Sequence, residues 1–82
     1  MTVLEKRRID REFQIFTSRH FEKPKKCKNA DQIRFYVREL TLKMENYREE
    51  FDYIPAAAYE MLANYNLILN QMVYEEFKNT YC

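Results

Sequence analysis

The side chains that most often carry catalysis are scarce in this chain of 82 residues. His20 is the only histidine and Ser18 is the only serine. Nucleophilic catalysis needs a nucleophile, a base and a group that orients the base, and no spacing here brings such a set together. His20 continues the apolar positions Ile9, Phe13 and Phe16 along one helical face. We therefore expect His20 at the edge of the core or in an interface, and we expect no enzyme.

Metal and cofactor sites are equally poorly supplied with ligands. Cys27 and Cys82 are the only cysteines, so the chain lacks the four nitrogen or sulfur ligands of a structural zinc site. Carboxylates that can do acid–base work or bind hard cations gather at positions 45, 49, 50 and 52, and we interpret them instead as a charged, solvated helix end. The sequence predicts no cofactor, and it predicts free thiols in a reducing compartment.

The chain contains no glycine. Glycine provides positive φ angles and close backbone approach, which phosphate-binding loops and nucleophile elbows require. Its absence therefore disfavours those classes of enzyme and favours a chain that is almost entirely helical. The basic start of the chain is not followed by the apolar run of a secretion signal, and no stretch has the length of a membrane span. We expect a cytoplasmic protein.

Positive charge is concentrated at the start of the chain. Residues 1–28 hold nine Lys/Arg and four Asp/Glu, whereas residues 29–82 hold five and nine. Such a surface can bind nucleic acid, an anionic membrane or an acidic protein, and it can also attract the acidic half of the same fold or simply face solvent. The candidate basic docking face consists of Arg7, Arg8, Arg11, Arg19, Lys25, Lys26 and Lys28.

Two helices are predicted in the first two thirds of the chain. Thr2 followed by Glu5 forms a capping box, and the first helix is expected over residues 3–21. Pro24 then favours a basic linker over residues 23–29. The second helix, over 30–50, begins at the cap residue Asn29. A heptad seam, typical of a helix packed on another helix, runs through Ile33, Val37, Leu40, Met44, Tyr47, Phe51 and Ile54.

The third helix is expected over residues 54–79, with Asp52 as its cap and Pro55 in its first turn. It carries two apolar stripes, which indicates two packing partners: both other helices, or one helix and another chain. One stripe is formed by Tyr59, Leu62, Leu69, Val73 and Phe77, and the other by Ala58, Met61, Tyr65, Ile68 and Met72. The candidate partner interface is Tyr59, Met61, Tyr65, Ile68, Met72 and Tyr74.

The junction between Asp52 and Pro55 allows two arrangements. A tight turn would make the second and third helices an antiparallel hairpin, which we favour. A single long helix kinked at Pro55 would instead have to dimerise to cover its seams.

In its length and its glycine-poor, Asn-, Lys- and Tyr-rich composition, the chain resembles the small accessory proteins of T-even-type bacteriophages, among them lysis-inhibition antiholins. The resemblance covers the whole chain but rests on no motif, so it assigns no site residues. It implies a short cytoplasmic protein that inhibits or redirects one other protein.

Together these features predict a single all-α domain over residues 1–82, a three-helix, bundle-like fold with the third helix central. The predicted function is a non-enzymatic regulator or inhibitor that binds another protein through helix faces, and a second copy of the chain is among the partners considered. The alternative is a small nucleic-acid-binding protein that uses the basic N-terminal third.

Overall fold

The computed structural model describes residues 2–81, and it confirms an all-α fold of three helices, with no strand in that range. The helices are α1 (Val3–His20), α2 (Ala30–Phe51) and α3 (Ala56–Tyr81), and a 3-10 turn, η1 (Pro24–Lys26), lies between α1 and α2. At most of the helix ends, the observed bound differs from the expected one by one or two residues. The basic linker is thus partly ordered as η1, because Pro24 begins it with a suitable φ.

Side-chain caps fix where the first two helices begin. The Thr2 hydroxyl accepts a hydrogen bond from the Glu5 amide at 3.2 Å, and the Asn29 side chain accepts one from the Gln32 amide at 2.8 Å. The Gln32 side chain in turn accepts from the backbone amide of Lys28 at 2.9 Å. These bonds satisfy amides that have no partner inside the helix. Both starts lie where the cap residues predict them.

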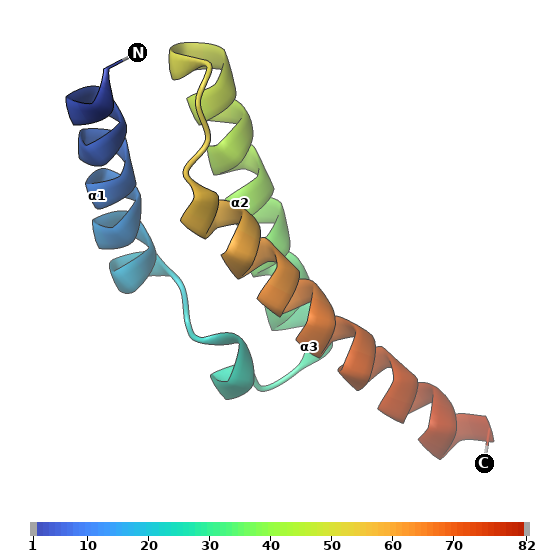
Figure 1. Ribbon diagram of the computed structural model, residues 1–82. Coiled ribbons are helices and arrows are strands. Elements are labelled where there is room, and N and C mark those ends of the chain that lie inside the picture. The colour runs from blue at the N-terminus through green and yellow to red at the C-terminus, as the bar shows by residue number, and fades with distance from the viewer. Residues whose placement is uncertain (1, 82) are drawn as a thin grey trace.

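The chain reverses direction between Phe51 and Ala56, so α2 and α3 form the expected antiparallel hairpin rather than one kinked helix (Figure 1). The prediction for Asp52 is wrong: it ends α2 instead of capping α3. Its φ of 51° and ψ of 38° lie in the left-handed region, and its amide donates to the Arg48 carbonyl at 2.9 Å. In a chain without glycine, Asp takes this C-terminal position because its short polar side chain tolerates it.

The core is built mainly by the heptad seam of α2. Ile33, Leu40, Met44 and Tyr47 are buried there, and α1 adds Ile9 and Phe13. The side chains of Ala58 and Tyr65 complete the core from α3. Cys27, the residue that follows η1, is buried with them. The seam predicts that the second helix packs on another helix, and the structure shows α2 facing both others.

The expected central position of the third helix holds only for the first part of α3. Residues 56–72 pack on the body, whereas every residue from 73 to 80 is exposed. Figure 1 shows this C-terminal arm extending well beyond α2, and the molecule measures 54 × 21 × 15 Å. The reason is geometric. The α3 helix is four residues longer than α2, and the extended segment before it runs back along α2, so α3 begins part-way along α2 and its last turns lie beyond it (Figure 1).

Candidate interaction surfaces

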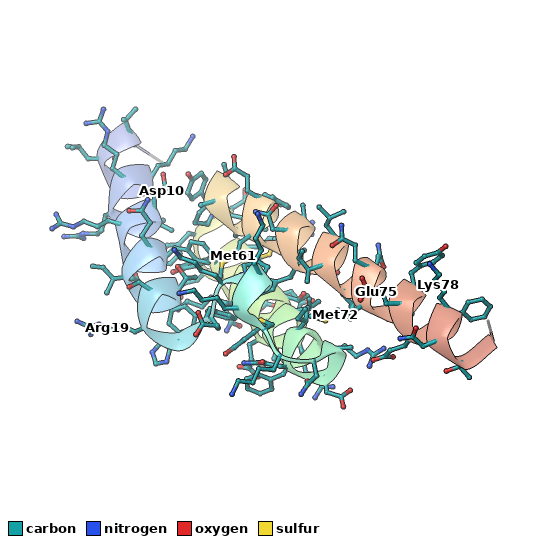
Figure 2. The ribbon with its side chains drawn as sticks, turned by 90° about the horizontal axis from the view of Figure 1, so that it is seen from below. Asp10, Arg19, Met61, Met72, Glu75 and Lys78 are labelled. Atoms are coloured by element: carbon teal, nitrogen blue, oxygen red, sulfur yellow. The ribbon has the colours of Figure 1, made fainter. Side chains whose placement is uncertain are left out.

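The two apolar stripes of α3 have different environments. The stripe that contains Tyr65 faces the core: Ala58 and Tyr65 are fully buried, and Met61, Ile68 and Met72 are half-buried against them. Because α3 runs antiparallel to α2, Met72 lies toward the start of α2, as Figure 2 shows. The stripe that contains Leu62 and Leu69 lies beside the core and reaches the surface at Tyr59 and Val73, which are 54% and 41% exposed.

This division corrects the candidate partner interface. Tyr65 cannot contact a partner, and Met61, Ile68 and Met72 are used largely for packing within the chain. Of the six proposed residues, only Tyr59 and Tyr74 are exposed. Helical periodicity identifies both stripes but does not say which one α2 covers.

Tyr65 is held in place by a polar bond and by aromatic packing. Its hydroxyl donates to the backbone carbonyl of Glu22, and its ring lies 5.7 Å from that of Tyr36 and 6.3 Å from that of Phe21, between centroids. Burial raises the pKa of Tyr65 well above its usual range. This cluster joins α3, α2 and the end of α1, so Tyr65 has a structural role.

Large and polar side chains bridge α1 to the rest of the molecule. The Phe13 and Tyr47 rings meet edge to face at 6.2 Å, and the Tyr53 hydroxyl donates to Asp10 at 2.8 Å. The Lys43 ammonium lies 4.7 Å from the centroid of Phe16 and 3.8 Å from a Glu12 carboxylate oxygen. These contacts fix the side of α1 that faces the core and leave its arginines on the opposite side.

The arginines of the candidate basic docking face are free of ion pairs within residues 2–81. Arg7, Arg8 and Arg11 line a shallow depression of about 530 Å³ on the outer side of α1, together with Leu4, Glu12 and Ile15. Figure 2 shows Arg19 pointing away from the other two helices. The outer face of α1 is thus both cationic and partly apolar, because Leu4 and Ile15 are exposed among the arginines.

The lysines belong to a second basic surface. A pocket of about 440 Å³ lies between η1 and α3 and is lined by Lys23, Pro24, Lys25, Lys26, Asn64, Leu67 and Ile68. This pocket shares no residue with the depression on α1. Lys28 is exposed but lines neither of them. The structure therefore divides the predicted basic face into two patches.

The sequence-based candidate sets omit Lys23, Pro24, Asn64 and Leu67 of this pocket, and Leu67 is the exposed apolar residue among them. It is 57% exposed and lies outside both apolar stripes, among polar residues of α3. A lone leucine in a polar strip of a helix indicates an exposed apolar residue, so the sequence could have identified Leu67 as a surface candidate. The position of η1 beside it, however, depends on the tertiary fold.

The groups considered for catalysis lie apart from these surfaces. His20 is exposed, and its ring rests 4.8 Å from that of Phe16. The carboxylates at positions 45, 49, 50 and 52 are all exposed, and residues 2–81 contain no cluster of three or more potential metal ligands. The Cys27 thiol is buried, and burial together with the charge of Glu22 raises its pKa. Cys82 lies outside the described residues.

Comparison of the chain with protein-family models, with curated proteins and with solved structures finds no match. Within residues 2–81, no helix combines the length and the apolar character needed to cross a membrane.

Proposed function

We propose that this chain is a non-enzymatic regulator or inhibitor that binds another protein through α3. The observation that carries the proposal is the apolar stripe left at the surface. Leu62 and Leu69 are half-buried, and the stripe continues to Val73 on the arm, where α2 no longer covers it. An apolar helix face of this kind fits a helix, or a groove between helices, of a partner.

The resemblance to small bacteriophage accessory proteins supports an inhibitory role, with a phage or host protein such as the soluble segment of a holin as the target. A cytoplasmic location belongs to the same proposal. It draws support from the two cysteines, which have no CxxC spacing and are expected to be free thiols.

The test is capture of a partner from host extract by wild-type protein and by two matched variants. Val73→Glu places a charge in the surface stripe and should abolish capture. Leu42→Glu, at a residue 49% exposed on α2, makes the same kind of change elsewhere and should leave capture intact. The proposal fails if no protein is retained by wild type, or if Val73→Glu retains the same protein equally well.

The unpaired arginines on α1 support nucleic-acid binding as a second candidate function. Four exposed guanidinium groups without partners can neutralise phosphates. Binding to a mixed DNA and RNA pool should then fall steeply between about 50 and 200 mM salt. The double variant Arg8→Glu/Arg11→Glu should lose it, and the absence of a gel shift at low salt would remove this candidate.

A further inference from the structure

One face of α3 lies beside its core-facing stripe, with Ile68 at their shared edge, and remains exposed along most of its length. It contains residues three, four and seven positions apart, which share a side of a helix. Its members are Asn64, Leu67, Ile68, Gln71, Tyr74, Glu75 and Lys78, of which only Ile68 is half-buried. This outer face lies almost opposite Val73, so it is distinct from the stripe of the proposed function.

The two ends of this face have complementary chemistry. At one end, Leu67 and Ile68 line the same pocket as Lys23, Lys25 and Lys26. At the other end, on the arm, an exposed aromatic residue precedes an exposed acid: Tyr74 is 66% exposed, and Glu75 forms no ion pair within residues 2–81. A pocket lined by both lysines and apolar side chains suits an acidic side chain next to an aromatic one.

The arm of the same molecule cannot fill this pocket. Glu75 follows Leu67 by eight residues on one continuous helix, which places it about 12 Å further along the axis. Figure 2 shows Glu75 and Lys78 on the part of α3 that extends past the other helices. The acidic segment is therefore available only to another molecule.

We propose that two copies of this chain pair antiparallel through the outer faces of α3, each placing Glu75 at the lysine-lined pocket of the other. A two-fold axis at Gln71 brings the three relevant positions into register. It sets Glu75 against the partner's Leu67, Tyr74 against the partner's Ile68, and Lys78 against the partner's Asn64. The same patch serves both copies, as a two-fold symmetric interface requires.

Sedimentation of charge variants tests the pairing. Wild-type protein should show a monomer–dimer equilibrium that weakens with salt, and Glu75→Lys should raise the dimer dissociation constant roughly tenfold or more, since the charge contact occurs twice. Glu76→Lys is the matched control. It makes the same change one residue along, on another side of the helix, and should leave the dissociation constant unchanged. A strictly monomeric wild type, or equal effects of the two variants, would overturn the proposal.

Mixing two variants shows whether the contact is made between molecules. Glu75→Lys and the double variant Lys25→Glu/Lys26→Glu should each be largely monomeric alone, because like charges then meet. Mixed in equal amounts, they should form a heterodimer, since both contacts then join opposite charges. Lys78→Glu should tighten the wild-type dimer, because position 78 faces the same lysines. Failure of the mixture to associate would contradict the proposal.

The dimer goes beyond the proposed function, and the two can fail separately. Val73→Glu should abolish capture of a partner protein and leave the dimer intact. Glu75→Lys should do the reverse.

Discussion

Two buried tyrosines illustrate how differently one residue type can contribute to the same core. The Tyr65 hydroxyl donates to the Glu22 carbonyl and ties α3 to the segment after α1. The Tyr47 hydroxyl is buried and makes no hydrogen bond of ordinary geometry among the described residues, although the Glu12 carboxylate lies near enough to raise its pKa. A buried polar group that is satisfied contributes modestly to stability, whereas one that is not satisfied costs free energy. The ring of each residue packs well, so the difference lies in one oxygen atom.

Removing each hydroxyl should therefore have opposite effects on stability. Tyr65→Phe should lower the free energy of unfolding by about 1 kcal/mol or more, because it leaves the Glu22 carbonyl without its donor. Tyr47→Phe should leave the free energy of unfolding unchanged or raise it slightly. Urea unfolding at pH 7, followed by circular dichroism, measures both. Equal losses in the two variants would show that the Tyr47 hydroxyl has a stabilising partner.

Tyr47 is also expected to make the protein less stable at alkaline pH. Burial, with the nearby charge of Glu12, raises the pKa of Tyr47 to about 12, against 10 for an unperturbed tyrosine. Between these values the unfolded chain has released the phenolic proton and the folded chain has kept it, so rising pH favours unfolding. From pH 9 to pH 11 this residue should cost about 1 kcal/mol. Tyr47→Phe should show a correspondingly smaller loss over that range.

At the scale of the elements, the turn between α2 and α3 does without glycine. Its φ > 0 position is taken by Asp52, at some cost in backbone energy, and Pro55 is buried just before α3 begins. Pro55 offers its carbonyl to the Ala58 amide at 3.0 Å and so starts the third helix. The hairpin thus depends on Asp52, which tolerates a positive φ, and on Pro55, whose ring fixes φ.

Substitution at Asp52 should reveal this cost. Asp52→Gly should raise the free energy of unfolding by about 0.5–1 kcal/mol, because glycine adopts the left-handed conformation without strain. Asp52→Val should lower it by at least 1 kcal/mol, since a β-branched side chain is strongly disfavoured there. Thermal unfolding of the two variants is the measurement. A destabilising glycine would show that the Asp52 side chain makes a contact that outweighs the strain.

At the scale of the whole molecule, burial is unevenly distributed. The first part of α3 and the seam of α2 form a shared core, α1 is attached through aromatic and polar side chains, and the arm of α3 has no intramolecular cover. Isolated helical turns are marginally stable in water, and most helical stability comes from packing. The three regions should therefore open with different free energies.

Amide hydrogen exchange on dilute protein should resolve these regions. Amides of residues 75–80 should exchange fastest, those of α1 at intermediate rates, and those around Leu40 and Tyr65 slowest, near the global limit. Raising the protein concentration should slow exchange in the arm if the proposed dimer forms. Uniform protection along α3 in dilute solution would contradict the uneven distribution of burial.

The sequence by itself determined where the helices lie, to within one or two residues, but it left open whether the second and third helices form a hairpin. Thr2 and Asn29 cap the first two helices, the heptad seam identifies the buried side of α2, and the two prolines divide the chain. These features follow from local hydrogen bonding and helical periodicity, which act within a few residues. Because the chain has no glycine, Asp52 takes the left-handed position at the end of α2.

Only the tertiary structure decided which side of α3 is buried and which surfaces remain. Both stripes of α3 have helical spacing, and the choice between them depends on where α2 and η1 lie, which no local pattern encodes. The pocket lined by the η1 lysines and Leu67 arises because segments distant in sequence pack together. The arm arises because α3 begins part-way along α2 and is also the longer helix. Helical periodicity shows which residues share a face of a helix, whereas tertiary packing decides which other element covers that face.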